Sequence, residues 1–343
     1  MKYLWIALAA GGLISGCSVE NKTEVSQQVE ESSLSAVMLN TQTRAPVAKK
    51  VPHELTAHSV TRNDNYYWMR DDSRTDKEIL AHLDEENSYV ETVLAPLKGN
   101  REALYEELVS RIEKDDSTVP VFDNGYWYYT RYSGENEYPI YLRKPTLEAE
   151  PSVLLDANIM SEGHDYFSIG SYAISSDNKL LAYSEDTLSR RIYTIFVKDL
   201  ESGDKLNDVL EGTSGRVVWA NDNTHLFYVK KDPQTLLGYQ VYRHKLGTAQ
   251  SDDTLIYEES DPTFYTYISK SKDSRVIYIH HNNTDKTGVT LVDANDPTAS
   301  TEVFLPLKDG QEYSVAKAED GYYVLTNIDA KNFRIMKAPL DGF

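Results

Sequence analysis

The sequence predicts a mainly β protein whose larger part is a β-propeller, preceded by a segment with two helices. Three observations lead to this prediction. A turn-and-strand pattern occurs five times after residue 117, and each unit leaves room for about four strands. The chain also holds 25 tyrosines, a residue type that suits half-buried strands. Because the WD and kelch signatures are absent, a long array of β-sandwiches is the alternative fold.

The first residues predict export and lipid attachment. Lys2 is followed by an apolar run that is too short to span a membrane, which is typical of a signal peptide. The run ends in ISGC at residues 14–17, which resembles the bacterial lipoprotein box. We therefore expect a lipoprotein signal peptide over 1–16, a lipidated Cys17 and a flexible tether over 17–54. An ordinary signal peptide with an incidental cysteine is the alternative.

Lipidation at Cys17 would anchor the protein to a membrane of the cell envelope, on the periplasmic side in a bacterium with two membranes. The membrane is then a predicted partner of the chain. Cys17 is also the single cysteine, which excludes a disulfide framework within one chain.

Residues 55–116 predict a helical segment. Thr75 followed by Glu78 fits a capping box, and apolar residues then recur on one helical stripe until Pro96 marks the end. Asn100 can cap a second helix, in which leucine and isoleucine recur every four residues. Both helices are amphipathic, so each needs a surface to pack against.

An aromatic block precedes the first helix. Tyr66, Tyr67 and Trp68 lie together, and charged residues flank them on both sides. A half-buried strand would alternate the two kinds of residue, whereas the core of an interface beside its polar rim has this arrangement. The block is therefore a candidate contact with another surface.

The five repeated units span residues 117–343. Each has a polar turn that contains an aspartate and then a tyrosine-rich strand, and a second apolar strand usually follows. Units of about 40 to 50 residues with four strands are typical of propeller blades. The stretch Gly212-Thr213-Ser214-Gly215 is interpreted as the turn between two blades. The aspartates of the repeated turns, separated by 54, 45, 51 and 47 residues, are Asp123, Asp177, Asp222, Asp273 and Asp320.

The net charge and the absence of several motifs argue against some functions. Lys and Arg number 35 against 54 Asp and Glu, and the net charge of −19 argues against nucleic-acid binding. The charge would favour cationic ligands, although solubility alone also explains it. No nucleophile elbow, HExxH, CxxC, phosphate loop or dinucleotide fingerprint occurs, so we expect no cofactor. His280 and His281 point to opposite faces of a predicted strand and do not share a metal easily, so no metal site is expected either.

Several long segments resemble oligopeptidase B, in the prolyl oligopeptidase family of serine peptidases. They include RNDNYYWMRDDSR, FDNGYWYYTRYSGENEYPIYLRKP and VVWANDNTHLFYVKKDPQTLLGYQVYRHKLGT. Together the matching segments extend over about residues 60–343 with few interruptions. The chain is similar to the N-terminal half of these enzymes.

This resemblance implies a fold and an activity. Such enzymes have a seven-bladed propeller, which acts as a size filter and gate, and an α/β-hydrolase domain with a Ser-Asp-His triad. They cleave short peptides after Arg or Lys. The triad and the specificity carboxylates would lie downstream of Phe343, so no catalytic residue is assigned here. We expect a partial propeller of about five blades over 117–343, no hydrolase domain in this chain, and an inactive 343-residue chain. Short basic peptides would be partners through the missing domain.

The resemblance also suggests what the aromatic block faces. In the family, the segment before the propeller packs on the hydrolase domain, so Tyr66, Tyr67 and Trp68 are candidate domain-interface residues. The alternative is that they staple the helices to the first blade. The stretch Ser189-Arg190-Arg191 also matches the family. Its arginines either face the same interface or form ion pairs within a blade.

Two functions remain open. The first is the N-terminal part of a lipid-anchored, trypsin-like oligopeptidase. The second is a non-catalytic envelope lipoprotein whose propeller is a binding or scaffold module. The helices and the aromatic block, which need a partner surface, favour the first function.

Overall fold

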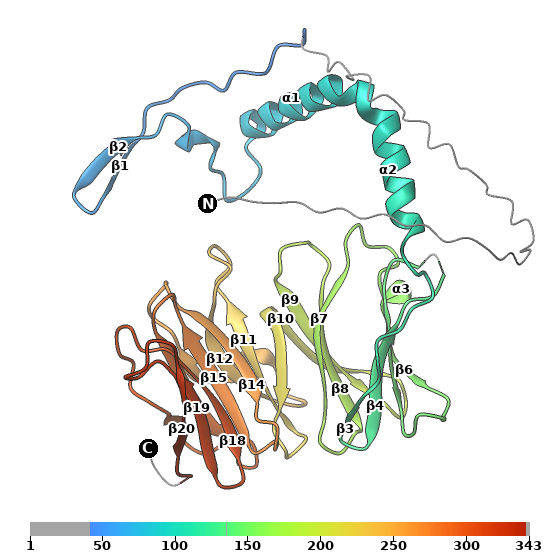
Figure 1. Cartoon of the computed structure of the whole chain (residues 1–343), viewed down its shortest axis with the longest axis vertical. Helices are drawn as coiled ribbons and strands as arrows, with labels where there is room; N and C mark the ends of the chain where they lie inside the picture. The colour runs from blue at the N-terminus through green and yellow to red at the C-terminus, as the bar shows by residue number, and fades with distance from the viewer. Residues whose placement is uncertain (1–41, 135, 341–343) are drawn as a thin grey trace, which may run out of the picture. The chain divides into compact units, whose positions relative to one another are not determined.

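The computed structural model describes residues 42–134 and 136–340, and Figure 1 shows the chain. The predicted signal peptide, Cys17 and most of the predicted tether lie outside the described residues. The chain divides between Val109 and Ser110 into two compact units. Among the described residues, no helix is both long enough and apolar enough to cross a membrane.

The N-terminal unit begins with a hairpin that the sequence analysis did not predict. β1 (Glu54–Ala57) pairs antiparallel with β2 (Val60–Asn63), and positive φ angles at His58 and Ser59 form the turn. The aromatic block follows as a short 3-10 helix, η1 (Tyr67–Met69), so it is not a strand.

Two consecutive helices complete the N-terminal unit. α1 (Lys77–Leu94) and α2 (Lys98–Ser110) are joined by one 3-10 turn, η2 (Ala95–Leu97). Pro96 lies in this turn, and the predicted end of the first helix is confirmed. A proline inside a helix would remove one backbone hydrogen bond and clash with the preceding turn.

The predicted starts of both helices were wrong. α1 begins after Asp76, whose carboxylate accepts hydrogen bonds from the backbone N–H groups of Glu78 and Ile79 at 2.8 and 3.2 Å. Aspartate caps a helix at least as well as threonine, and Thr75 instead donates its backbone N–H to Asp71. α2 starts directly after η2, so Asn100 lies within the helix.

The second unit consists of five successive antiparallel blades, which confirms the predicted propeller (Figure 1). Blades 1 and 4 have four strands each, and blade 5 has three among the described residues. Blades 2 and 3 share one seven-stranded sheet because a single long strand belongs to both.

The strands follow one another around the unit in chain order. Blade 1 contains β3 (Val121–Asp123), β4 (Tyr126–Arg131), β5 (Ile140–Lys144) and β6 (Ser152–Asp156), followed by the short helix α3 (Ala157–Met160). Blades 2 and 3 contain β7 (Ser168–Ile174), β8 (Leu180–Asp186), β9 (Tyr193–Asp199), β10 (Lys205–Trp219), β11 (His225–Lys231), β12 (Gly238–Lys245), the 3-10 turn η3 (Gln250–Asp252) and β13 (Thr254–Glu258). Blades 4 and 5 contain β14 (Tyr265–Lys270), β15 (Val276–Asn282), β16 (Thr287–Asp293), β17 (Glu302–Val303), β18 (Tyr313–Ala318), β19 (Gly321–Thr326) and β20 (Arg334–Ala338).

The connection between blades 2 and 3 differs from the prediction. The stretch 212–215 does lie between the two blades, but it belongs to the continuous strand β10 and is not a turn. The pairing register shifts there, first against β9 and then against β11. Gly215 has a φ of +87°, and an added Cβ would lie 2.9 Å from the ring of Tyr193. A glycine bulge therefore lets one strand bend from blade 2 into blade 3.

The repeated aspartates stabilise the turns in which they lie. Asp177 Oδ1 accepts hydrogen bonds from the hydroxyl of Ser175 at 2.6 Å and from the backbone N–H of Lys179 at 3.2 Å. Asp273 makes the same pair of contacts with Ser271 and Arg275. Such a turn closes each first hairpin, which explains why the motif recurs once per blade.

The buried core lies in the seams between successive blades. Each seam contains aliphatic and aromatic side chains from the facing sheets, and four clusters of this kind link blades 1 to 5 in order. Examples from the four seams are Leu154 with Leu181, Ile195 with Leu226, Val241 with Ile277, and Leu291 with Val324.

Trp219 tests this seam packing. It is 2% exposed, and its indole N–H donates to the backbone oxygen of Ala173 in the neighbouring blade at 2.9 Å. We expect Trp219→Phe to lower the free energy of unfolding by about 1 to 3 kcal/mol, because it removes this bond and leaves a void. Urea denaturation measures the change. Tyr265→Phe, at a 61% exposed position, is the control and should change stability by less than about 0.5 kcal/mol.

Candidate functional site

A cavity of about 1050 Å³ opens where the first hairpins of blades 1 to 4 converge. Tyrosine, threonine, serine and asparagine side chains form most of its wall. Such a surface offers many hydrogen bonds to a peptide backbone, and Asp123, Lys270 and Lys272 add charge to it. The lining includes Thr118, Tyr128, Tyr172, Ser176, Asn221 and Lys270.

Hydrogen bonds between turns hold the mouth of this cavity together from blade to blade. Asn124 donates its side-chain N–H to Ser176 O at 2.9 Å, and Asn221 donates to Ser274 O at 2.8 Å. Between them, the Ser176 hydroxyl donates to Asn221 Oδ1 at 3.2 Å. In blades 1 to 4, a residue beside the repeated aspartate therefore links its blade to a neighbour.

One lysine of the cavity wall, Lys270, has a shifted pKa. Its ammonium group donates to Asn221 Oδ1 at 2.6 Å. Burial lowers the pKa of Lys270, and the negative charge of Asp123 opposes this shift. An ammonium group in such a weakly hydrated place can bind a carboxylate or a peptide carbonyl oxygen.

One serine–histidine contact lies in blade 4. Ser269 Oγ and His280 Nε2 are 2.8 Å apart. Burial, and then the positive charge of Arg216, lowers the pKa of His280 to about 4. No carboxylate bonded to this ring is found in the described part of the chain, so the pair lacks the third member of a hydrolytic triad. The described residues also contain no cluster of three His, Cys, Asp or Glu side chains that could hold a metal ion.

The sequence analysis missed this contact, although a signal existed. Lys270 and Ile277 pair across the Asp273 turn. Counting outward from that turn places Ser269 and His280 on the same face of neighbouring strands.

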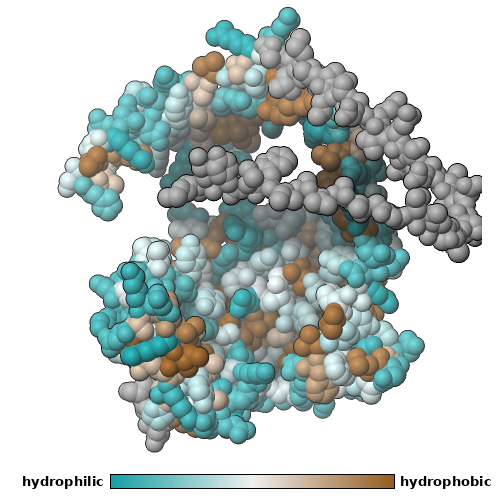
Figure 2. All heavy atoms as spheres, in the orientation of Figure 1, coloured by the Kyte–Doolittle hydropathy of each residue, from teal (hydrophilic) through white to brown (hydrophobic). Residues whose placement is uncertain are grey.

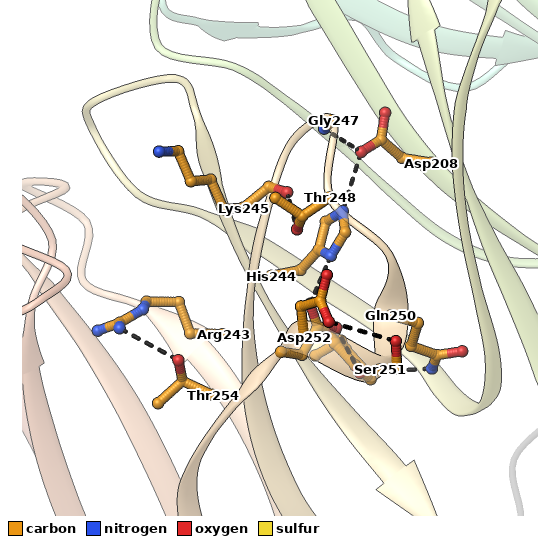
Figure 3. A network of polar contacts seen from close by, with 12 residues as sticks. Asp208, Arg243, His244, Lys245, Gly247, Thr248, Gln250, Ser251, Asp252 and Thr254 are labelled. Carbon is orange, nitrogen blue, oxygen red and sulfur yellow. Dashed lines mark hydrogen bonds and ion pairs between the residues drawn. The ribbon is translucent and has the colours of Figure 1, made fainter.

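A buried charged network ties blade 2 to blade 3 (Figure 3). His244 is fully buried, with Nδ1 2.7 Å from Asp253 Oδ1 and Nε2 2.9 Å from Asp208 Oδ1. The backbone N–H of Gly247 and the hydroxyl of Tyr228 donate to the same two carboxylates. Burial alone would lower the pKa of His244, but the hydrogen bonds and charges of Asp253 and Asp208 outweigh burial and raise this pKa.

The predicted interface aromatics are partly engaged within the N-terminal unit. The indole N–H of Trp68 donates to Lys49 O at 2.9 Å, and the ring of Tyr67 stacks on His53 at 4.0 Å. Both side chains are half-buried, whereas Tyr66 is 42% exposed. Their role at a domain interface remains a prediction.

The two helices of this unit contain no buried residue. Leucine and valine side chains on both are about half exposed, and Figure 2 shows hydrophobic side chains on the surface of the helical segment. A cavity of about 750 Å³ lies in the angle between the helices, lined in part by Leu94, Leu104 and Leu108. A surface of this kind marks a site of interaction.

The loop that joins β8 to β9 exposes a basic segment. Asp186 shapes the loop by accepting hydrogen bonds from the backbone N–H groups of Leu188 and Arg191. Within the described residues, neither Arg190 nor Arg191 forms an ion pair, and Arg190 Nε is buried without a hydrogen-bond partner. The predicted ion pairing within a blade was therefore wrong, and both oxygens of Asp186 accept hydrogen bonds from the backbone of the loop.

Comparison with known proteins identifies related chains. Residues 46–343 match the family described as "Prolyl oligopeptidase, N-terminal beta-propeller domain". Dipeptidyl aminopeptidase BI of Pseudoxanthomonas mexicana is 42% identical over 314 residues, which cover 86% of this chain and 43% of that protein. Protease 2 of Moraxella lacunata is 33% identical over 306 residues, which cover 87% of this chain and 44% of that protein.

Solved structures agree with these matches. Oligopeptidase B from Leishmania major has a TM-score of 0.81 at 30% identity, over 86% of this chain and 44% of that chain. Oligopeptidase B from Trypanosoma brucei, in a closed form with covalently bound antipain, has a TM-score of 0.78 at 29% identity, over 87% of this chain and 45% of that chain. The chain thus spans less than half the length of these relatives.

His244 should make stability depend on pH. Its folded pKa is raised above the unfolded value of about 6.5, so its contribution is complete below that pH and is lost as the pH rises through the folded pKa. We expect His244→Asn to lose about 3 to 5 kcal/mol at pH 6, because two buried carboxylates lose their partner.

Urea denaturation at pH 6 and pH 9 measures both effects. The difference in the free energy of unfolding between wild type and His244→Asn should be smaller at pH 9 than at pH 6. His58→Asn, at the exposed hairpin tip, is the matched control and should leave the profile unchanged. A gap of equal size at both pH values would contradict a protonated His244.

Proposed function

Since the chain belongs to the prolyl oligopeptidase family, we propose that it forms the propeller part of a serine oligopeptidase that cleaves short peptides after Arg or Lys. The propeller acts in this proposal as the gate and size filter of the enzyme. The match over residues 46–343 is the observation that carries the proposal.

The exposed helices support a second domain as the partner of the N-terminal unit. α1 and α2 have apolar stripes but no buried residue, and an amphipathic helix is stabilised mainly by burying its apolar face. We propose that the hydrolase domain of the enzyme covers these faces. Arg190, which lacks an ion pair, then contacts a carboxylate of the same domain.

The size of the cavity at the first hairpins supports the proposal that the propeller selects substrates by size. A volume of about 1050 Å³ is near the upper end of small-ligand pockets, about 300 to 1000 Å³, and cannot take up a folded domain. The bonds from Asn124 and Asn221 to neighbouring blades oppose widening of its mouth. A short extended peptide fits, and its cationic side chains would be attracted by the net charge of −19.

We expect the 343-residue chain alone not to hydrolyse a short, N-terminally blocked arginine amide. A longer protein that joins this propeller to a hydrolase domain should cleave it. Acyl transfer needs a nucleophile, an oriented base and oxyanion donors, and loss of a whole triad lowers kcat by about a million-fold in a well-studied serine protease. The amide carries a chromophoric amine as its leaving group, and release of this amine measures turnover.

Two controls make this test decisive. Ser269→Ala removes the hydroxyl that contacts His280, so turnover by the chain that survives purification but disappears in this variant would contradict the prediction. A dipeptide amide with a free amino terminus, assayed beside the blocked substrate, distinguishes an endopeptidase from a dipeptidyl aminopeptidase, the name of the 42% identical relative.

Leu108→Asp tests the helical interface in two contexts. Leu108 is 54% exposed in α2, so in the 343-residue chain the substitution should change stability by less than about 0.5 kcal/mol. In the longer protein it would bury a carboxylate without a partner, and we expect a loss of about 3 kcal/mol or more, with a parallel fall in activity. Thermal unfolding and amide hydrolysis measure the two effects.

Glu106→Gln is the matched control, since it lies on the same helix, is exposed and points away from Leu108. It should be neutral in both proteins. An equal response to Leu108→Asp in both contexts would argue against a covering domain.

A further inference from the structure

A histidine is buried in the seam between blades 3 and 4. His281 in β15 is 5% exposed and has the same strand orientation as Ile277 and Ile279, which pack on blade 3. Tyr257 of blade 3 stacks on the ring at 4.9 Å between centroids. The β16 residue paired with His281 is Gly288, and an added Cβ would overlap the imidazole. The seam is therefore shaped around this ring.

Among the residues that the structure describes, the ring nitrogens have no hydrogen-bond partner. Both Nδ1 and Nε2 of His281 are buried and unpaired, and so is the hydroxyl of Thr266, the residue opposite His281 on β14. Both nitrogens of this imidazole are thus buried without a hydrogen bond in the described part of the chain. In most proteins such buried polar groups are paired, so the site is unusual.

The charges that face the ring are few. From the end of β13, the carboxylate of Glu259 places Oε2 3.8 Å from His281 Nδ1. That oxygen already accepts a hydrogen bond from the Tyr257 hydroxyl at 2.7 Å, and Oε1 accepts one from the backbone N–H of Asp261 at 2.9 Å. Phe264, Thr266 and Gly288 supply uncharged surface from the other packed elements, and His280 points to the opposite face of β15.

We propose that this seam is an acid-labile joint of the propeller, which opens when His281 takes up a proton. The protonated ring would hold a charge in the seam with Glu259 beyond hydrogen-bond distance. Drawing the carboxylate closer would shift the Tyr257 hydroxyl that is bonded to it, and with it the ring that stacks on His281. Either outcome disturbs the contact between blade 3 and blade 4.

The pH range of the opening follows from linkage. Burial lowers the pKa of His281, and the opposing effect of Glu259 is smaller. As the pH falls below about 6.5, the unfolded or opened chain binds the proton first, so the stability of the closed seam falls until the pH reaches the lowered pKa. The opening equilibrium can rise by up to about tenfold for each pH unit in this range.

The seam on the other side of blade 3, toward blade 2, is stabilised when its histidine is protonated. His244 is held between two carboxylates, and its protonated form stabilises the contact with blade 2. Acidification therefore retains blades 2 and 3 as one body while it loosens blade 4.

Hydrogen exchange of the 343-residue chain at pH 7.5 and pH 5.0, corrected for the intrinsic rates, tests the joint. We expect amides of β13 to β16 to exchange at least about tenfold faster at pH 5.0, while β8 to β11 change much less. His281→Phe, which keeps an aromatic ring against Tyr257, should reduce the acceleration. Burial also lowers the pKa of His280, on the other face of β15, so the comparison is repeated in a His280→Phe background, where His281→Phe should again reduce the acceleration.

An equal acid response in wild type and His281→Phe would overturn the proposal, as would acceleration spread evenly over all blades. If His281→Phe does not fold, the carbon-bound proton signals of the wild-type histidines supply the second measurement. A His281 signal that titrates below pH 6.5 supports the joint, and one that titrates at or above pH 6.5 overturns it. Neither result depends on peptidase activity.

Discussion

The propeller unit depends on the burial of sheet faces against neighbouring blades. A single antiparallel blade is apolar on both faces and cannot bury either alone. The outermost described blade shows this directly. Along β19, Tyr322 and Val324 are buried toward blade 4, whereas Tyr323 and Leu325 on the other face are 41% and 46% exposed. Phe122 in blade 1 is 57% exposed. Further blades packed on these faces would bury them as blades 2 to 4 are buried.

The N-terminal unit lacks such a core. Its contacts are local, and the rings of Tyr67 and Trp68 rest on the extended chain at His53 and Lys49. Hydrogen bonds at a cap and isolated ring contacts each contribute about 1 kcal/mol, which is small against the conformational entropy of ordering two helices. The N-terminal unit therefore needs a covering domain more than the propeller unit does.

Features that depend on local spacing could be predicted from the sequence. The aspartate turns recur because each closes one hairpin through its own neighbours, and the stop at Pro96 follows from proline geometry alone. The cap at Asp76 was missed because two adjacent residues were both suitable, and only the bonds from Glu78 and Ile79 decide between them. Contacts across blades could not be predicted, since Asp208 and His244 are 36 residues apart and meet only through the sheet order.

The histidines show most clearly what sequence spacing leaves open. The prediction that His280 and His281 point to opposite faces of one strand is confirmed. The residues HHNN alone do not indicate that His280 meets the Ser269 hydroxyl, or that the His281 nitrogens are buried in a seam without a hydrogen bond in the described part of the chain. His244 also lies in a tyrosine-rich strand, but the carboxylates of Asp208 and Asp253, from other segments, reverse the direction of its pKa shift. A propeller brings one strand of each blade against a different neighbour, so identical residues at similar positions acquire opposite responses to protons. Blade 3 has His244 on the side of blade 2 and His281 in the seam with blade 4. Its two seams therefore respond differently to acid, although their hydrophobic cores are alike.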